Sequence, residues 1–441
     1  MAHHISNWGN YPVVPAIEVS FTMADQLPGV LTKACIARGN GRCYGDASLA
    51  ETVISTRKFD KLLAFDASAG VLHCQAGVLL ADLLDVFVPR GWFLPVTPGT
   101  KYITVGGAVA SDVHGKNHHV DGAFSSHVLD MTVHTGQGPL RCSARENDEL
   151  FAATCGGMGL TGIILDVRLR LKKIHTAYIR QRQVKAARLE EAFDLFEEYA
   201  GYTYSAAWID CLQTGKGFGR SILFLGEHAT PVEVQGGGGN DPLRLPAGKK
   251  ITVPFYLPSV VLNPLSIRVF NALYYHKQVK KICDSVVPYE GFFYPLDAVL
   301  HWNRLYGRSG FVQYQFVLPK AAGRQGLVEI LRRISQRGLG SFLAVLKLFG
   351  PQDSLISFPM EGYTLALDFP IRRGLFAFLD DLDRIVLAYG GRLYLSKDAR
   401  MRREVFWKSY PHSQKFFAIV QKYNPGFYFR SVQSDRIGMT L

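Results

Sequence analysis

The sequence has few cysteines, and their spacing shows no pairing pattern. Its seven cysteines are odd in number and include no CxxC pair. Disulfide frameworks and thiolate metal sites need paired or closely spaced cysteines, so both are disfavoured and a reducing compartment is expected. His114, His118 and His119 lie within one short loop and make a poor ligand set, so no metal site is expected.

Long apolar runs are also missing. No stretch of eighteen apolar residues runs without a charge, and residues 1–20 lack a basic segment followed by an apolar one. A membrane-spanning helix needs the first feature and a secretory signal needs the second. We therefore expect a cytoplasmic protein without a signal peptide or a transmembrane span, and peripheral contact with a membrane stays open.

Clusters of basic residues are scarce, although the formal net charge is +12. The cationic residues are scattered, apart from short groups such as Arg400, Arg402 and Arg403. No helix-turn-helix, zinc-finger or RNP pattern is present, so no nucleic-acid partner is expected. The charge suits a membrane surface or a phosphorylated substrate, and charge alone does not choose between them.

The length of 441 residues exceeds what one hydrophobic core usually serves and predicts two domains. Residues 1–176 are typical of one α+β unit, with a strand expected at 72–77 and a helix at 78–91. After residue 176 the elements become longer. Strands are expected there at 204–211 and 220–228, and a helix at 188–200.

Residues 236–250 are rich in Gly and Pro and are expected to form a mobile loop. The apolar run 251–265 follows Lys249 and Lys250. This run either touches a bilayer or a polyprenyl tail, with the lysines at anionic head groups, or completes the domain core. The sequence leaves both interpretations open.

Three glycine-rich stretches carry the strongest functional signal: RGNGRCYGD (38–46), PGTKYITVGGAVASDVHGKNHH (98–119) and GGMGLTG (156–162). Glycines let the main chain approach a planar or phosphorylated ligand, and the first stretch follows a short apolar run, as an anion-binding nest does. The third contains a formal GxGxxG. A Rossmann-type NAD site is nevertheless rejected, because helix-like DELFAATC precedes these glycines and strand-like IILDVRLRL follows them.

The order of these stretches resembles the PCMH-type FAD-binding domain of the vanillyl-alcohol oxidase superfamily. Five later segments resemble the decaprenylphosphoryl-β-D-ribose 2′-oxidase family, and the resemblance covers nearly the whole chain: FFYPLD (292–297), WNRLYGR (302–308), GFVQYQFVLP (310–319), LDFPI (367–371) and GGRLYLSKDAR (390–400). The resemblance implies a two-domain α+β fold. Its FAD-binding domain is residues 1–176 completed by 391–441, and its substrate-binding cap, residues 177–390, is built on an antiparallel sheet.

The resemblance also implies FAD as the cofactor. We expect it to be non-covalent, because Thr100 stands where bicovalently linked relatives carry a cysteine and residues 38–46 contain no histidine. The residues that the resemblance places at the cofactor are Arg38, Gly39, Asn40, Gly41, Arg42, Cys43, Tyr44, Gly45, Asp46, Pro98, Gly99, Thr100, Thr104, Val105, Gly106, Gly107, Ala110, Ser111, His114, Gly115, Asn117, Gly157, Gly159, Gly162, Ile163 and Tyr394.

A flavin-dependent alcohol oxidase needs a group that receives the hydroxyl proton and positive charge beside the reduced flavin. The resemblance gives catalytic roles to Lys397, His114 and Tyr44. Lys397 is expected either to stabilise reduced flavin as an ammonium or, once desolvated, to act as the base. Without the motif, Lys397 would be interpreted as a surface lysine and Tyr44 as a packed aromatic.

Gln313 and Gln315 alternate on one expected strand, so they point the same way and can read neighbouring sugar hydroxyls, unless the strand exposes a polar edge. Mycobacterial members of the family carry a cysteine where Ala366 stands, so covalent nitroaromatic inhibitors that need it are not expected to react. The residues placed at the substrate are Lys116, Trp208, Gln313, Gln315, Lys347, Thr364, Asp368 and Lys397.

The activity implied by the resemblance is oxidation of the 2′-hydroxyl of a polyprenyl-phosphoryl-β-D-ribose to the ketone by hydride transfer to flavin N5. This is the first half of an epimerisation to the arabinose donor for cell-wall polysaccharide. The implied partners are an NADH-dependent short-chain reductase acting on the keto product, and a quinone or oxygen as electron acceptor. The alternative is a soluble aldonolactone or sugar-alcohol oxidase of the same superfamily that uses oxygen.

Overall fold

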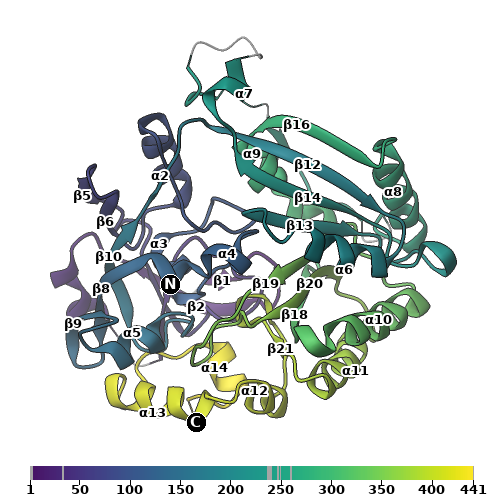
Figure 1. Cartoon of the computed structure of the whole chain (residues 1–441). Helices are drawn as coiled ribbons and strands as arrows, with labels where there is room; N and C mark the ends of the chain where they lie inside the picture. Colours follow the sequence, from purple (N-terminus) through teal and green to yellow (C-terminus); the bar gives the residue numbers. More distant parts are fainter. Residues whose placement is uncertain are drawn as a thin grey trace.

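The computed structural model of the chain describes residues 3–31, 34–235, 241–245, 248, 250–258 and 261–440. Most of the predicted loop 236–250, including Lys249, therefore lies outside the described residues. Figure 1 shows an N-terminal region beside the yellow C-terminal helices, and a second region built around a large sheet. The fold is α+β with two domains, as predicted.

Two sheets form the N-terminal region. The first has the order β1-β2-β4-β3 and the second has the order β5-β6-β10-β8-β9. The strand predicted at 72–77 is β6, and the helix predicted at 78–91 contains α2. The strands of these two sheets are β1 (His3–Ile5), β2 (Val14–Ser20), β3 (Cys35–Arg38), β4 (Thr52–Ser55), β5 (Leu62–Asp66), β6 (Val71–Gln75), β8 (Val128–Thr135), β9 (Gly138–Ser143) and β10 (Ile163–Arg170).

The second region is an eight-stranded antiparallel sheet with the order β16-β12-β14-β13-β19-β20-β18-β21. The strands predicted at 204–211 and 220–228 are confirmed as β13 and β14. Its strands are β12 (Tyr178–Ala186), β13 (Tyr204–Ile209), β14 (Ser221–His228), β16 (Ile282–Pro288), β18 (Phe311–Pro319), β19 (Ala344–Phe349), β20 (Gly362–Pro370) and β21 (Arg392–Leu393). Two short pairs join β7 (Trp92–Phe93) to β11 (Lys172–Lys173) and β15 (Ile251–Thr252) to β17 (Val299–Leu300).

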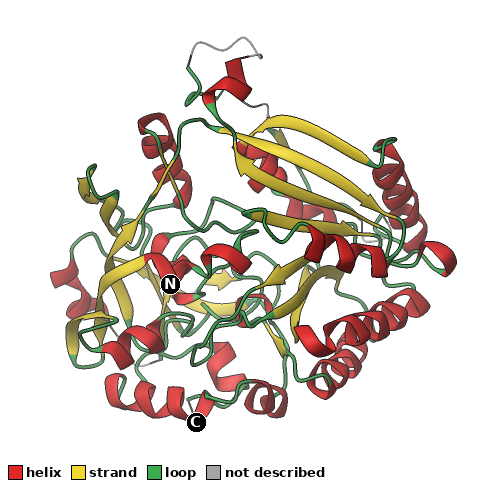
Figure 2. Cartoon of the chain, viewed as in Figure 1, coloured by secondary structure: helices red, strands yellow, loops and turns green. Residues whose placement is uncertain are grey.

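Three helices cover one face of the large sheet (Figure 2): α6 (Leu189–Glu198), α10 (Lys320–Arg337) and α11 (Leu375–Ala388). Helix α6 is the one predicted at 188–200, and its apolar side is buried while its acidic residues face outward. Phe193 on α6 packs against Tyr363 of β20, with ring centroids 4.8 Å apart. Because this face is filled by helices, the opposite face of the sheet is the one left to form a site.

The remaining helices lie mainly around the N-terminal region, and most of them are short. They are α1 (Leu27–Val30), α2 (Leu80–Phe87), α3 (Val105–Ala110), α4 (His118–Asp121), α5 (Asp148–Thr154), α7 (Pro231–Gln235), α8 (Pro264–Lys277), α9 (Tyr289–Phe293), α12 (Arg403–Ser409), α13 (Ser413–Tyr423) and α14 (Val432–Arg436). In the cap, α8 lies at one end of the large sheet (Figure 1).

The C-terminal part of the chain returns to the N-terminal region. After β21, the short helix η7 (Leu395–Lys397) leads into α12. Further on, the Cys35 N–H donates to the Tyr428 carbonyl and the Arg430 N–H donates to the Cys35 carbonyl, both at 2.9 Å, so this segment extends the first sheet beside β3. These contacts bring residues 428–430 to the first sheet of the N-terminal region. The domain limits at residues 176 and 390 stay a prediction.

Candidate active site

One face of the large sheet carries most of the predicted substrate residues. Antiparallel partners share a face, and so do alternate residues along one strand. Trp208 pairs with Val345, Lys347 with Thr364, Ala366 with Gln315, and Asp368 with Gln313. The strand register therefore brings together Trp208, Lys347, Thr364, Asp368, Gln313 and Gln315.

Gln313 and Gln315 point the same way, as predicted, and β18 lies between β20 and β21 rather than at a polar edge. Gln313 Nε2 donates to Asp368 Oδ1 at 2.6 Å, and the Tyr306 hydroxyl donates to Asp368 Oδ2 at 3.4 Å. Burial raises the pKa of Asp368 to about 7 despite the opposing effects of Gln313 and Lys397. This carboxyl group therefore titrates near neutrality.

His114 reaches the same face from the second glycine-rich stretch. Gln315 Nε2 lies 3.0 Å from His114 Nε2 and donates to it, which leaves the imidazole proton on Nδ1. His114 Nδ1 is buried and has no hydrogen-bond partner within the described part of the chain. Burial, reinforced by Lys347, holds the pKa of His114 well below its usual value, so the ring is neutral and Nδ1–H is available to a ligand.

Three half-buried lysines border this face. Lys397 Nζ lies 3.9 Å from the Tyr44 ring centroid, and burial lowers its pKa to about 7, opposed by Asp368. Burial together with Lys347 lowers the pKa of Lys116 to about 7, and burial lowers that of Lys347 to about 8. Lys116 Nζ donates to the Phe292 carbonyl at 2.9 Å. Lys397 lies near Asp368 and Lys116 lies near Lys347, so the site gathers three cationic groups and suits an anion.

The two predicted tyrosines join separate loops at this place. The Tyr44 backbone N–H donates to the Ser396 carbonyl at 3.0 Å, which ties residues 38–46 to η7. The Tyr394 hydroxyl donates to the Ser111 carbonyl at 2.9 Å, and its ring stacks on Phe358. Both side chains are buried, so both tyrosines also pack as core aromatic residues, which was the alternative interpretation.

The first two glycine-rich loops face each other closely. Asn40 Nδ2 donates to the Tyr102 carbonyl at 2.8 Å, and a Cβ added to Gly39 would lie 2.2 Å from Thr104 Oγ1. For the backbone N–H groups of residues 40–43, we find no acceptor within the described ranges of the chain. A row of N–H groups in a glycine loop is the donor set that a pyrophosphate needs. The residues present therefore fit a flavin dinucleotide.

The third glycine-rich loop packs against α3. The Gly156 N–H donates to the Val109 carbonyl at 3.0 Å, and the Met158 N–H donates to the Ala110 carbonyl at 2.9 Å. Helix α5 precedes the loop and β10 follows it, which confirms the order that excludes a Rossmann turn. This loop carries the predicted cofactor residues Gly157, Gly159 and Gly162 next to the second loop.

Some predicted cofactor residues have their side chains committed elsewhere. Asn117 Nδ2 donates to the Pro95 carbonyl at 2.8 Å and to Asp121 Oδ2 at 2.6 Å. The Ile163 side chain is fully buried in a small core near Phe21. Asp46 accepts hydrogen bonds from Arg436. For these three residues the structure shows a supporting role for the side chain.

Sequence reasoning missed Arg436. Its Nη2 lies 2.8 Å from Asp46 Oδ1 and 2.8 Å from Asp398 Oδ2, and both carboxyl groups are buried. The ion pairs connect the first glycine loop to the residue after Lys397. No local pattern marks Arg436, because its two partners are 390 and 38 residues away in the sequence.

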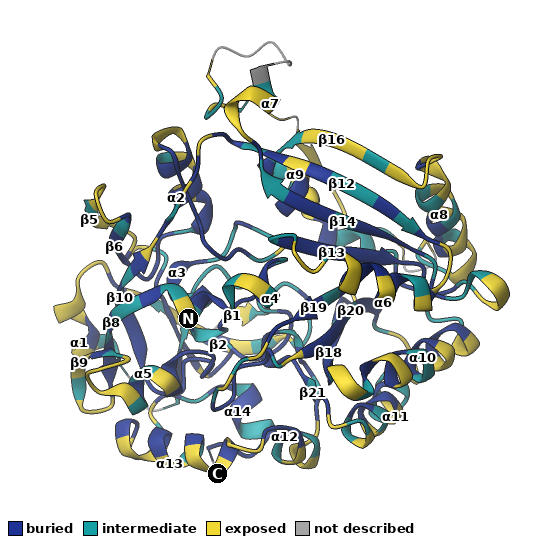
Figure 3. Cartoon of the chain, viewed as in Figure 1, coloured by how far each residue is buried: buried dark blue, intermediate teal, exposed yellow. Residues whose placement is uncertain are grey.

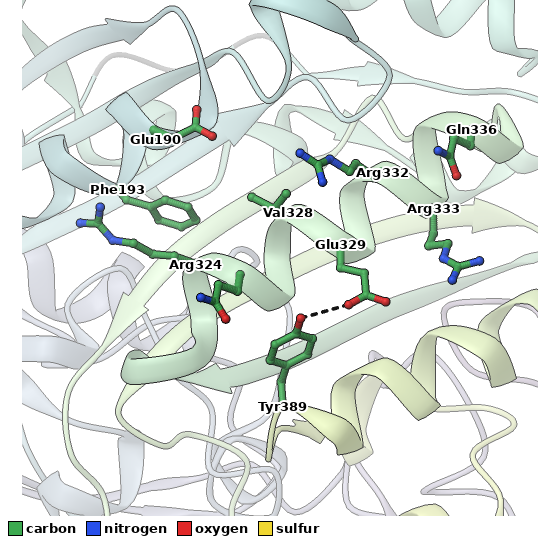
Figure 4. A pocket seen from close by; sticks show the side chains of 10 residues that line it. Glu190, Phe193, Arg324, Val328, Glu329, Arg332, Arg333, Gln336 and Tyr389 are labelled. Carbon is green, nitrogen blue, oxygen red and sulfur yellow. Dashed lines mark hydrogen bonds between the residues drawn. The ribbon is translucent and has the colours of Figure 1, made fainter.

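A separate hollow of about 770 Å³ opens on the helix-covered face of the cap (Figure 4). Arg324 on α10 forms an ion pair with Asp194 on α6 at 2.9 Å, and the Tyr389 hydroxyl donates to Glu329 at 3.0 Å. None of the predicted site residues lines this hollow, which distinguishes it from the candidate active site. It is lined by Glu190, Phe193, Arg324, Gln325, Val328, Glu329, Arg332, Arg333, Gln336 and Tyr389.

Residues 31–143 match the family model described as FAD binding domain. The chain is 35% identical to decaprenylphosphoryl-β-D-ribose oxidase of Mycolicibacterium smegmatis, over 98% of this chain and 97% of the relative. The chain belongs to the decaprenylphosphoryl-β-D-ribose oxidase family. It is also 31% identical to an uncharacterized protein of Streptomyces coelicolor, over 82% of this chain and 100% of that protein. L-gulonolactone oxidase of Bos taurus is 28% identical over 37% of this chain and 39% of its own length.

Membership in the decaprenylphosphoryl-β-D-ribose oxidase family makes the chain an FAD-dependent oxidoreductase, as the sequence predicts. The family model covers the first two glycine-rich stretches, and the row of N–H groups in the first of them fits the cofactor. Within the described ranges, no helix combines the length and apolar character needed to cross a bilayer.

Proposed function

We propose that the protein oxidises the 2′-hydroxyl of a polyprenyl-phosphoryl-β-D-ribose to the 2′-ketone. The observation that carries this proposal is the sheet face that holds the paired glutamines and Lys347, with Lys397 near Asp368 and Lys116 near Lys347 at its border. Its cations suit a phosphate and its amides suit sugar hydroxyls. The 35% identity to the mycobacterial ribose oxidase supports the same substrate class.

Residues of the three glycine-rich loops, with Tyr394, would hold FAD without a covalent bond. The N–H groups of residues 40–43 would bind its pyrophosphate, and Thr100 offers no linkage of the kind that a cysteine forms. When bound, FAD supplies the hydride acceptor. Tyr44 and Arg436 would keep the first loop against η7, so that the cofactor and Lys397 are presented to the same substrate.

Lys397 is proposed to receive the hydroxyl proton at Nζ. A pKa of about 7 leaves a large neutral fraction at neutral pH, and the aromatic face of Tyr44 holds the side chain in place. The opposing role, an ammonium that stabilises negative charge, becomes available after the proton has been taken up. Asp368 supports this protonated form because its carboxylate raises the pKa of Lys397.

We propose that three side chains orient the sugar: His114, Gln313 and Gln315. His114 donates from Nδ1, and the glutamines contribute amides on one side of the sheet. Lys347 and Lys116 would meet the substrate phosphate, while Thr364 would contact the ring. Trp208 would form a wall, and its own position is fixed because Nε1 donates to the Phe342 carbonyl at 3.0 Å.

The second candidate is an aldonolactone or sugar-alcohol oxidase that uses oxygen. Partial similarity to L-gulonolactone oxidase is the observation that favours it. This alternative keeps FAD and Lys397 but has no use for a phosphate site. For the first candidate we propose an NADH-dependent reductase as the consumer of the ketone, and a quinone or oxygen as the electron acceptor.

An anaerobic titration followed by flavin absorbance separates the two candidates. The purified protein would be mixed with a short-chain prenylphosphoryl ribose, with free ribose and with an aldonolactone. Bleaching by the phosphorylated lipid alone is expected, and Lys347→Gln should raise its half-saturating concentration. Bleaching by the lactone or free sugar alone would favour the second candidate, and a protein without flavin would contradict both.

A further inference from the structure

Helix α8 turns an apolar stripe toward solvent. Leu265, Val269 and Leu273 are 70%, 51% and 69% exposed, and their spacing of four places them along one side of the helix. Phe255 and Val279, which lie before and after α8, are 63% and 89% exposed. We call these five residues the docking face; Figure 3 shows the exposed positions of α8 beside those of β16.

The opposite side of α8 explains why the stripe is free. Ile267 and Asn271 are buried, and Asn271 Nδ2 donates to Asp210 Oδ1 at 2.8 Å. Tyr274 packs on Trp208 with ring centroids 4.7 Å apart. The helix is thus anchored to the cap through another side, and its apolar stripe is not needed to hold it. Exposed apolar side chains that follow one another along one side of a helix are typical of an interaction site.

Charge favours one partner for the docking face. From Lys250 to Cys283 the sequence contains no Asp or Glu. The cations of this segment are Lys250, Arg268, Lys277, Lys280 and Lys281, of which Arg268 and Lys277 lie on α8 itself and Lys281 is paired with Glu191 at 2.9 Å. Apolar side chains accompanied by Lys and Arg fit an anionic lipid surface. The apolar side chains enter the boundary of the acyl chains, and the Lys and Arg side chains contact the anionic head groups. A protein partner would need acidic residues to match this charge, and a second copy of α8 would repeat it.

A row of aromatic rings leads from α8 to the candidate active site. Phe270 contacts Phe342 with ring centroids 5.7 Å apart, and Phe342 stacks with Tyr306 at 5.8 Å. Tyr306 donates to Asp368 at 3.4 Å. An apolar chain lying along this row would join a bilayer to the sheet face that carries Asp368 and Gln313.

We propose that the docking face binds the surface of an anionic bilayer and so places the active site beside the membrane. The path taken by a prenyl chain rests on the proposed function, whereas binding to lipid does not. Binding to vesicles without substrate therefore tests the surface by itself, and the titration with prenylphosphoryl ribose tests the function.

The test is flotation of the FAD-loaded protein with vesicles. Vesicles of phosphatidylcholine and phosphatidylglycerol in equal parts should carry the protein upward, vesicles of phosphatidylcholine alone should not, and added salt should weaken the binding. Leu265→Glu/Leu273→Glu should lower the partition coefficient by about tenfold or more, because two apolar side chains no longer enter the lipid. Arg268→Glu/Lys277→Glu should weaken binding while leaving the apolar stripe intact.

The matched control is Leu62→Glu/Leu63→Glu on β5, where the two leucines are 41% and 46% exposed. This variant should bind vesicles like the unaltered protein, and flavin absorbance should show that every variant is folded. Absence of binding to anionic vesicles, or an equal loss in the β5 control, would overturn the proposal. So would a dimer in sedimentation velocity that Leu265→Glu/Leu273→Glu dissociates, because the docking face would then belong to a second copy.

Discussion

At the scale of single residues, the chemistry depends on groups that titrate near neutrality. Lys397 and Asp368 both have a pKa of about 7, because burial disfavours the charged form of each and their mutual attraction opposes that effect. Such values let one site accept a proton and hold positive charge within a single turnover. Neighbouring groups with perturbed pKa values are typical of catalytic sites.

Lys397→Met tests the proposed base. The rate of flavin reduction in the unaltered protein should rise with pH through about 7, because the neutral amine that accepts the proton forms as the pKa is passed. The variant should react roughly 10²- to 10⁴-fold more slowly and should lose this rise. Stopped-flow absorbance across pH measures both effects, and retention of the flavin spectrum is the control. A variant with an unchanged rate would remove Lys397 from the mechanism.

Asp368→Asn tests the coupling between the two groups. The carboxylate raises the pKa of Lys397, so the amide should lower it and move the rise in rate to more acidic pH. The asparagine oxygen can still accept the hydrogen bond from Gln313, which limits the change to charge. The pH profile of flavin reduction is the measurement, and a profile that stays in place or moves to alkaline pH would contradict the assignment.

Several of these residues were accessible from the sequence because they lie in short motifs. Lys397, His114 and the alternating glutamines are examples, and the strand register confirms that Gln313 and Gln315 share a face. The free Nδ1 of His114 was not accessible, because it depends on a contact with Gln315 across 201 residues.

At the scale of elements, the glycine loops and the cap strands β13 and β14 followed from local patterns, whereas the exposed apolar stripe of α8 did not. The sequence left residues 251–265 open between a buried core and a membrane contact. Ile251, Phe255 and Leu265 are 68%, 63% and 70% exposed, so these three residues are outside the core. The sequence pattern could not show that the apolar stripe is exposed, because apolar residues at helical spacing are normally interpreted as a buried face.

Gly39→Ala tests how closely the two loops must meet. The added Cβ would lie 2.2 Å from Thr104 Oγ1, which already accepts the Gly107 N–H at 3.1 Å, so the loops must move apart. Overpacking of this kind costs about 1–3 kcal/mol, and FAD affinity should fall by roughly tenfold or more. Fluorescence titration of the flavin-depleted protein measures the loss. Gly29→Ala is the control, because nothing lies within 4 Å of its added Cβ; equal affinities in the two variants would contradict the prediction.

At the scale of the whole molecule, the candidate active site is assembled from both ends of the chain and from the cap. The overall two-domain α+β arrangement and the return of the C-terminal part followed from the resemblance. The ion pairs of Arg436 could not be predicted, because a buried pair between residues 390 apart is set by packing and not by a local pattern.

Arg436→Met tests this long-range connection. It leaves Asp46 and Asp398 buried without their cation, which should destabilise the protein by about 3–5 kcal/mol and loosen the first glycine loop. Thermal unfolding and the fraction of bound flavin are the measurements. Arg430→Met is the control, because the pair of Arg430 with Asp435 is more exposed and should contribute only about 0–1 kcal/mol. Similar melting temperatures for the two variants would show that the buried pairs are dispensable.

The position of Arg436 late in the sequence also determines when its ion pair with Asp46 can form during biosynthesis. Asp46 is translated 390 residues before its partner. At a synthesis rate of about 5–20 residues per second, roughly 20–80 s pass between the synthesis of Asp46 and that of Arg436. During this interval the first glycine loop lacks the guanidinium group that holds it in place. We expect stable capture of FAD to follow the synthesis and docking of Arg436, so that flavin supply acts on a late stage of maturation.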